Sequence, residues 1–366
     1  MKIVCTQENL KLGLTTTGRI ISSNTSLPIL NNLMLKTENS MLKISSTNLE
    51  VGITTHIRCK VEEEGAVTIS SKTITELVNN LPNQNLTLMG DNSQLLVETE
   101  NYHTTIKTLP IDDFPLIPSI EQNQNLEIDT QQLKNSLDQV SFAVSLNQTQ
   151  PEISGVLFSF EGKILKIVAT DRYRLAEKLI DLSKTNNSNQ QIIIPHKTIN
   201  ELSRIIGTQK GNVELSFTET QACFKVDNTE IISRLVDGQY PDYKQIIPQN
   251  FATIIIVEKQ DLLGALKASG VFSQAGNSVK FVYEDSNQTL KLITESQDLG
   301  KSEIELQAKI AGKSGAVLLN HHYIIDCLGG MNTKNIVMKI INESSPSLLL
   351  AEGQNDYLYL VMPIKS

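Results

Sequence analysis

The glycine-rich segment at residues 311–315 is the stretch whose sequence comes nearest to a catalytic loop. It reads AGKSG, and a phosphate-binding loop ends in Gly-Lys-Ser or Gly-Lys-Thr at the start of a helix. The first glycine of such a loop would be at position 307, which is Gln307. No helical pattern follows Ser314, so the segment is predicted to be a loop between two strands rather than a nucleotide site.

Histidines and cysteines are the other candidates for chemistry. His321 and His322 are adjacent, but neighbouring residues on a helix point in different directions and no carboxylate lies at ligand spacing. A surface-facing pair is therefore expected. Four cysteines are scattered without Cys-x-x-Cys spacing, which indicates buried free thiols rather than disulfides or a zinc site, at Cys5, Cys59, Cys223 and Cys327. The sequence predicts a protein that is not an enzyme and that holds no cofactor or metal.

A helical pattern that recurs along the chain must position any functional residues. SKTITELVNNL at 71–81 returns as HKTINELSRII at 196–206 and as HHYIIDCLGGM at 321–331. Each copy places apolar residues at i, i+3, i+4 and i+7, which gives a helix one apolar stripe. A second helical pattern recurs at 7–20, 130–142 and 259–272, and each copy of the repeat is expected to open with this helix.

Short alternating segments between these helices indicate strands, so the expected fold class is α+β with three repeated domains. Pro-rich joints near residues 114 and 240 place the domain boundaries at 1–120, 121–248 and 249–366. Hydrophobic residues make up 40% of the chain and charged residues 20%, which is typical of a soluble globular protein. No apolar run reaches the length of a membrane span, and a cytoplasmic protein is expected.

The distribution of charge differs between the predicted helices and the rest of the chain. The net charge is −8, but the six predicted helices carry +2 and the remainder −10. Lys197 and Arg204 lie on the helix face opposite the apolar stripe of Ile199, Leu202 and Ile206. This face is either an ordinary solvated face or a weak interface for nucleic acid.

Two stretches depart from the repeat. Residues 169–176 read ATDRYRLA, a turn dense in charge and aromatic surface, and the chain ends in the apolar segment YLYLVMPIKS. A terminal segment is usually polar and frayed. An apolar one is either a paired edge strand or one wall of a binding groove, and the sequence leaves both interpretations open.

The whole chain resembles the bacterial DNA sliding clamp, the beta subunit of DNA polymerase III. The resemblance rests on the three repeats and on the strings ATDRYRLA, LVDGQYPDYKQIIP (235–248), LPILNNL (27–33) and VMPIKS. The resemblance implies three clamp-type domains, each with two helices packed on antiparallel sheets, in a ring formed by a head-to-tail homodimer. It implies a processivity factor that encircles double-stranded DNA without sequence specificity. The expected partners are the replicative DNA polymerase, the clamp loader and repair proteins.

The resemblance also assigns residues. A hydrophobic groove for short linear motifs of partner proteins is expected at Ile153, Thr170, Arg172, Tyr173, Arg174, Leu175, Pro241, Ile246, Ser345, Ser347, Leu360, Val361, Met362, Pro363 and Ile364. The residues expected to line the hole around DNA are Lys72, Lys134, Lys197, Arg204 and Lys267. The dimer interface is expected near Ile106, Val271 and Phe272. The alternative to a clamp is a strand-rich repeat scaffold that binds proteins without encircling DNA.

Overall fold

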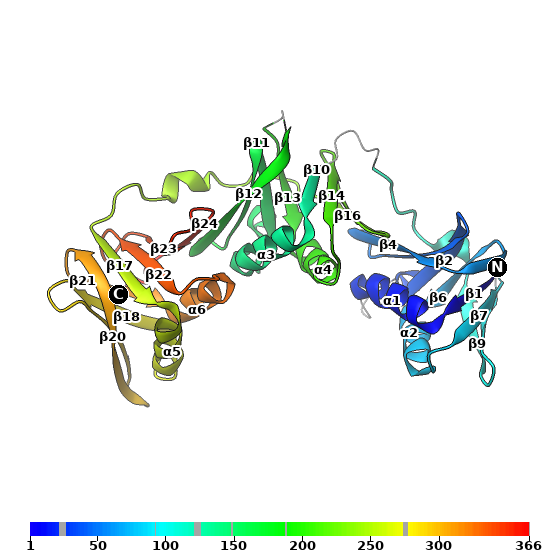
Figure 1. Ribbon diagram of the computed structural model, residues 1–366, viewed down its shortest axis with the longest axis horizontal. Coiled ribbons are helices and arrows are strands. Elements are labelled where there is room, and N and C mark those ends of the chain that lie inside the picture. Colours follow the sequence, from blue (N-terminus) through cyan, green and yellow to red (C-terminus); the bar gives the residue numbers. More distant parts are fainter. Residues whose placement is uncertain are drawn as a thin grey trace. The chain divides into compact units, whose positions relative to one another are not determined.

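A computed structural model describes residues 1–21, 27–91, 93–120, 126–147, 149–186, 189–273 and 277–365 of the chain (Figure 1). The chain divides into two compact units. The first contains residues 1–131 and 197–235, and the second contains residues 132–196 and 236–366. The second repeat contributes to both units, because some of its strands pair with the first repeat and others pair with the third.

The predicted helices are confirmed to within a few residues at their ends. They are α1 (Gln7–Thr17), α2 (Ser71–Asn80), α3 (Thr130–Val140), α4 (His196–Ile206), α5 (Lys259–Gly270) and α6 (His321–Gly330). The side-chain oxygens of Thr6, Ser70 and Asn320 accept hydrogen bonds from N–H groups in the first turns of α1, α2 and α6. The apolar stripes of α2, α4 and α6 face the protein interior, and Ile74, Ile199 and Ile324 are fully buried.

The expectation that each repeat opens with a helix is wrong, because a short strand precedes that helix in every copy. These strands are β1 (Lys2–Thr6), β10 (Leu126–Asp129) and β17 (Thr253–Glu258). They pair antiparallel with the strands that follow the second helix of the same repeat, β7 (Asn85–Gly90), β14 (Asn212–Phe217) and β22 (Asn335–Ile340). Four to six residues alternate too briefly to stand out beside the long helical pattern.

The first unit is built on an antiparallel arrangement with the strand order β10-β14-β15-β16-β4-β3-β2-β6-β9-β8-β7-β1-β5. Helices α1 and α2 pack on it through Leu10, Leu14, Ile74 and Val78, which belong to one buried hydrophobic cluster. Its further strands are β2 (Asn32–Glu38), β3 (Met41–Thr47), β4 (Val51–Arg58), β5 (Lys60–Glu63), β6 (Ala66–Ser70), β8 (Gln94–Glu98), β9 (His103–Leu109), β15 (Gln221–Val226) and β16 (Thr229–Arg234).

The second unit has the antiparallel strand order β13-β11-β12-β24-β23-β22-β17-β20-β19-β18-β21. Its core includes Leu262 and Leu266 of α5 and Ile324 and Leu328 of α6, all fully buried. Its further strands are β11 (Gly155–Thr170), β12 (Arg174–Asn186), β13 (Gln191–Pro195), β18 (Ser278–Glu284), β19 (Thr289–Ser296), β20 (Gly300–Gly312), β21 (Gly315–Asn320), β23 (Ser347–Ala351) and β24 (Tyr357–Val361).

The glycine-rich segment lies between strands, as predicted. Gly312 ends β20 and Gly315 begins β21, so Lys313 and Ser314 form a tight connection that leads into a strand and not into a helix. Gly312 has φ = 122°, and a Cβ there would lie 2.1 Å from the carbonyl oxygen of Ala252. The glycine therefore serves the turn and the close approach of a neighbouring strand.

The predicted surface-facing histidine pair is wrong for His321, which is only 4% exposed, whereas His322 is exposed. Nδ1 of His321 donates a hydrogen bond of 2.7 Å to the carbonyl of Asn277. Burial lowers the pKa of His321, so the neutral imidazole is favoured. Its ring packs against Gly270 at the end of α5, where a Cβ would lie 2.6 Å from Nε2.

The cysteines are free thiols, as predicted, and three of the four are buried while Cys59 is half-buried. Burial raises the pKa of Cys5 to about 12, which disfavours its reactive thiolate. In the described ranges, no three His, Cys, Asp or Glu side chains gather as a metal site would require. Within the same ranges, no helix is both long and apolar enough to cross a membrane.

Candidate functional site

Sheets of neighbouring repeats join through antiparallel strand pairs at two places, which we call the first and second junctions. At the first junction β4 pairs with β16, with Ile53 opposite Ile231. At the second junction β12 pairs with β24, with Leu175 opposite Leu360. The stretch ATDRYRLA and the apolar C-terminal segment therefore lie side by side at the second junction, and the C-terminal segment is a paired strand.

A tight turn at residues 170–174 leads into the second junction. Oγ1 of Thr170 donates to the carbonyl of Arg174 at 2.7 Å and accepts from the N–H of Arg172 at 3.2 Å. Oδ1 of Asp171 accepts from the N–H groups of Tyr173 and Arg174, both at 3.0 Å. Arg172 has φ = 77°, a left-handed conformation that these hydrogen bonds stabilise. The turn holds the side chain of Tyr173 63% exposed.

Strand alternation divides the residues of the second junction between two faces of the sheet. Leu175 is opposite Leu360, which is opposite Leu348 on the next strand, so these three side chains share one face. They belong to a hydrophobic cluster, here called the apolar cluster. Its buried members are Ile153, Leu157, Val168, Leu175, Ile193, Tyr240, Tyr243, Leu348 and Leu360.

Four of the residues expected in the partner groove meet at the apolar cluster, namely Ile153, Leu175, Leu360 and the half-buried Met362. Thr170 shapes the turn instead. Other residues of the set remain at the surface: Arg172, Tyr173, Pro241 and Ile246 are exposed, and Ser345, Pro363 and Ile364 are half-buried. Arg174, Ser347 and Val361 are opposite one another and therefore lie on the other face of the sheet.

Two aromatic residues outside the expected groove complete the cluster. Tyr240 and Tyr243 are buried, and their rings pack edge to face with centroids 6.5 Å apart. Oη of Tyr243 donates a hydrogen bond of 2.5 Å to Oε2 of Glu177, and burial together with this carboxylate raises the pKa of Tyr243. The signal was present in the joint LVDGQYPDYKQIIP, whose tyrosines are spaced three apart around a proline.

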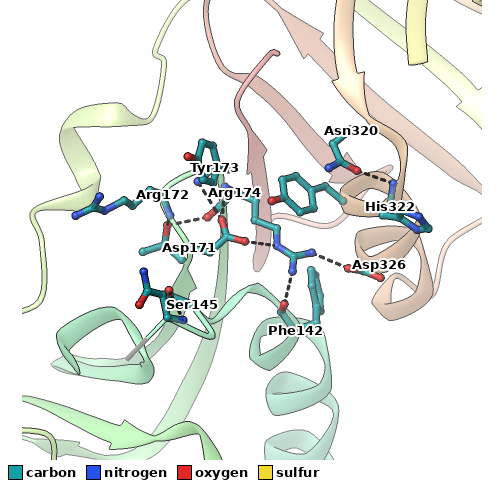
Figure 2. A network of polar contacts seen from close by, with 12 residues as sticks. Phe142, Ser145, Asp171, Arg172, Tyr173, Arg174, Asn320, His322 and Asp326 are labelled. Atoms are coloured by element: carbon teal, nitrogen blue, oxygen red, sulfur yellow. Dashed lines mark hydrogen bonds and ion pairs between the residues drawn. The ribbon is translucent and has the colours of Figure 1, made fainter. Parts of the chain in front are cut away.

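A polar network centred on Arg174 occupies the other face of the junction (Figure 2). Nε of Arg174 donates to Oδ2 of Asp171 at 2.9 Å, Nη1 to Oδ2 of Asp326 at 2.6 Å, and Nη2 to the carbonyl of Phe142 at 2.7 Å. Figure 2 shows Arg172 pointing away from this network. The guanidinium also lies 4.4 Å from the ring centroid of Tyr323. The side chain of Arg174 is only 11% exposed.

The predicted division of α4 into two faces is confirmed. Lys197 and Arg204 are exposed, while Ile199, Leu202 and Ile206 are buried. Among the other residues expected to line the hole, Lys72 and Lys267 are exposed and Lys134 is half-buried. Lys134 forms an ion pair with Asp138 and Arg204 forms one with Glu201. The helices thus carry few basic groups, and some of these are already partly neutralised.

Besides the end strands of the two sheets, β5, β10, β13 and β21, two further strands of the described part of the chain leave part of one edge open. Residues 103–107 of β9 pair with β8 alone, and only the last two residues of β9, Thr108 and Leu109, pair with β6. Residues 300–307 of β20 pair with β19 alone, and the rest of β20, from Ala308 to Gly312, pairs with β17. Of the residues expected at a dimer interface, Ile106 lies on β9 and is 8% exposed. Val271, just after α5, is 66% exposed and Phe272 is half-buried.

Comparison with known proteins accounts for this arrangement. Residues 1–118, 127–242 and 244–365 match, in that order, the N-terminal, central and C-terminal domains of the DNA polymerase III beta subunit. The chain belongs to the family of bacterial beta sliding clamps. The fold class is thereby confirmed as α+β with three clamp domains.

Relatives of this family cover the whole chain. The beta sliding clamp of Synechocystis is 29% identical over 388 residues, covering 100% of this chain and 99% of the relative. That of Pseudomonas aeruginosa is 27% identical and covers 94% of this chain and 95% of the relative. The solved structure of the P. aeruginosa clamp bound to griselimycin has a TM-score of 0.96 at 25% identity, with both chains fully covered. The Bacillus subtilis clamp also gives 0.96 at 25% identity, covering 100% of this chain and 99% of that one.

Proposed function

We propose that this chain is a DNA polymerase processivity factor, a sliding clamp that encircles duplex DNA and tethers the polymerase to it. The observation that carries the proposal is the presence of all three clamp domains in order, matched over the full chain by clamp structures at a TM-score of 0.96. A strand-rich scaffold with no DNA function is not favoured, because all these relatives are clamps. The three domains are proposed to span residues 1–120, 121–248 and 249–366.

Ring closure is proposed to occur between two copies of the chain. In the repeat, β9 corresponds to β16 and β24, while β20 corresponds to β4 and β12. Those four strands pair with one another at the two junctions, whereas β9 and β20 keep open edges. Pairing β9 of one copy with β20 of the next repeats the same contact and closes a head-to-tail dimer. Ile106, Val271 and Phe272 are proposed to lie at this contact.

DNA is proposed to be held by topology rather than by strong binding. A clamp must slide, so its contacts with the duplex should be sequence-independent and made to phosphate. Helices with a net charge near +2 suit this requirement better than a strongly basic surface would. The proposed contacts are the exposed Lys72, Lys197, Arg204 and Lys267, with Lys134 where its ion pair with Asp138 opens.

Partner proteins are proposed to bind the apolar cluster at the second junction. The supporting observation is that exposed apolar side chains adjoin cluster residues. Ile246, 45% exposed, precedes Ile247 of the cluster in the chain, and the carbonyl of Tyr173, 63% exposed, accepts from the N–H of Met362. Two or three apolar anchors of about 1.5–3 kcal/mol each give roughly micromolar affinity after the cost of ordering. This strength would let a polymerase, a clamp loader and repair proteins exchange on one ring.

We further propose that the chain has no catalytic activity, depends on a separate ATP-driven loader and acts in the cytoplasm. Griselimycin is a suitable probe of the partner surface, because clamps of Pseudomonas aeruginosa and Bartonella birtlesii bind it. We propose that it occupies the apolar cluster of this chain.

The test of encirclement is retention on circular DNA. The protein is loaded onto nicked plasmid with a bacterial clamp loader and ATP, and the complex is isolated by gel filtration before and after linearisation. A clamp should stay on the circle and be lost when the plasmid is cut, because a closed ring leaves only over a free end. Equal retention on both forms would refute encirclement. Phe272→Asp should abolish retention and yield monomers in light scattering, whereas an unchanged mass would exclude the proposed interface.

A further inference from the structure

The turn at the second junction has a counterpart of the same geometry at the first. Oγ1 of Thr47 donates to the carbonyl of Val51 at 3.1 Å and accepts from the N–H of Leu49 at 3.1 Å. Oδ1 of Asn48 accepts from the N–H groups of Glu50 and Val51 at 3.0 and 2.8 Å. Leu49 has φ = 75°, against 77° for Arg172. Valine occupies the position of Arg174, so the arginine is not needed to form the turn.

Arg174 differs from Val51 in what it reaches beyond the turn. Its three donor groups contact Asp171 in the turn, Asp326 on α6 of the third repeat, and the carbonyl of Phe142 just after α3 of the second repeat. The guanidinium lies between the rings of Tyr323 and Phe142, at 4.4 and 5.4 Å from their centroids. A planar guanidinium spreads its donors over three nitrogens, whereas the three donors of a lysine ammonium all lie on one nitrogen. One side chain therefore ties the second repeat to the third.

The sheet separates these contacts from the apolar cluster. Arg174 is opposite Val361, whereas Leu175 is opposite Leu360 and faces the cluster. The two faces are nevertheless linked through the backbone, because the N–H of Met362 donates to the carbonyl of Tyr173 at 2.8 Å. Met362 belongs to the C-terminal segment of the third repeat and Tyr173 to the turn of the second. Movement between the repeats would therefore separate the two sides of the partner surface.

We infer that Arg174 is a positioning residue. It holds the second and third repeats together on the sheet face opposite the apolar cluster. The cluster is thereby arranged for a partner that Arg174 itself does not touch. This inference rests on the proposed partner surface. Preorganisation of this kind increases the fraction of the protein that is ready to bind a partner, and the apparent affinity rises with that fraction. Loss of Arg174 should then slow association and leave dissociation almost unchanged.

The first test needs no ligand. Amide hydrogen exchange of the intact protein is compared between wild type and Arg174→Met, with residues 47–51 of the first junction as the internal reference. The amide of Met362 should exchange about tenfold faster in the variant, since its hydrogen bond crosses between the two repeats. Exchange in residues 47–51 should not change. Unchanged exchange at Met362 would overturn the inference.

The second test measures griselimycin binding by surface plasmon resonance. Arg174→Met should lower the association rate constant about five- to tenfold and keep the dissociation rate constant within about twofold. Arg174→Lys should recover little, because the acceptors are bound by three different nitrogens of Arg174 and a single ammonium nitrogen cannot take the place of all three. A faster dissociation with unchanged association would mean that Arg174 contacts the ligand, and unchanged rates would mean that it positions nothing. Either result overturns the inference.

Two milder variants and one control guard against misfolding. Asp171→Asn places in the second turn the residue type that Asn48 has in the first, and removes one charged contact of Arg174. Asp326→Asn removes the other charged contact. Each should slow association about two- to threefold. Lys43→Met removes the 3.0 Å ion pair with Glu38, which lies within the first repeat, and should change neither rate. If wild-type protein binds no griselimycin, the proposed partner surface fails, and the exchange of Met362 still decides whether Arg174 holds the repeats together.

Discussion

The two junctions share one backbone design but present different side chains. At the first junction the N–H of Arg234 donates to the carbonyl of Glu50 at 2.9 Å, and at the second the N–H of Met362 donates to that of Tyr173 at 2.8 Å. Glu50 and Arg234 are exposed and charged. The second junction puts an aromatic ring and a thioether in the same places. The proposed partner surface therefore differs from the first junction in its side chains and not in its backbone.

The residue after each turn sharpens this contrast. Gly52 at the first junction lies against Ile117 of the following linker, and a Cβ there would be 2.8 Å from Cγ2 of Ile117. Leu175 holds the corresponding place at the second junction, within the apolar cluster. The first junction has a smaller cluster, whose buried members are Ile29, Leu30 and Phe114. Linker residues cover both junctions. Ile117 lies against Gly52 at the first, whereas Tyr240 and Tyr243 pack with Leu175 in the apolar cluster that is proposed to receive a partner at the second.

Removal of the C-terminal segment should have the largest effect. A chain that lacks residues 362–366 loses Met362 and the bond from the N–H of Ile364 to the carbonyl of Leu318. Griselimycin affinity, measured by isothermal titration, should fall by at least about 100-fold because several apolar contacts are lost. The dimer mass by light scattering should stay the same, since the segment lies outside the proposed dimer contact. Full affinity in the truncated chain would separate the partner surface from the second junction.

Exchanging one residue between the junctions should have the next largest effect. Met362→Arg gives the second junction the charged residue of the first and should weaken griselimycin about 10- to 30-fold, by removing an apolar contact and placing a charge beside the cluster. Arg234→Met at the first junction is the matched control and should leave affinity unchanged. Tighter binding in the control would show that the first junction also binds the probe.

Gly52→Ala tests how the linker closes the first junction. The added methyl group would overlap Ile117, so the free energy of unfolding should fall by about 1–3 kcal/mol in chemical denaturation. Gly264→Ala, on an exposed position of α5 with no atom within 4 Å of the new Cβ, should instead be neutral or raise stability by up to about 1 kcal/mol. Equal effects at the two sites would contradict the close approach of the linker. Griselimycin affinity should not change in either variant.

The smallest expected effect concerns the linker of the second junction. Glu161 pairs with Lys166 at 2.7 Å and with Lys244 of the linker at 2.8 Å, and these contacts lower the pKa of Glu161. Because the pKa is lower in the folded state, the contribution is present near neutral pH and is lost as pH falls below about 4.5. Glu161→Gln should cost a few tenths of a kcal/mol at pH 7, and the cost should shrink as the pH is lowered through the pKa of the folded state. Thermal unfolding across this range measures the difference, and a constant difference at all pH values would argue against the ion pairs.

Much of the fold could be predicted because the repeat presents each helical stripe three times. Ile74, Ile199 and Ile324 fall in register and all are fully buried. The strands that open each repeat were not predicted, because four to six alternating residues give a weak signal. His321 was placed at the surface because its burial depends on Gly270, which lies 51 positions earlier in the sequence.

The candidate site could be predicted as a set of residues but not as two faces. Resemblance brought Arg174, Leu175, Leu360 and Val361 together without showing which side chains face the same way. Only the strand register separates Leu175 and Leu360 from Arg174 and Val361. The contacts of Arg174 with Asp326 and with the carbonyl of Phe142 join residues 152 and 32 positions apart, and no local pattern encodes them.

The central claim is that this clamp offers one partner surface per chain, at the second junction. Isothermal titration of griselimycin into the dimer tests it most directly, because the stoichiometry counts the sites. The account predicts one molecule bound per 40.6 kDa chain, with binding weakened by Met362→Arg. Two molecules per chain, or one that is insensitive to Met362→Arg, would contradict it.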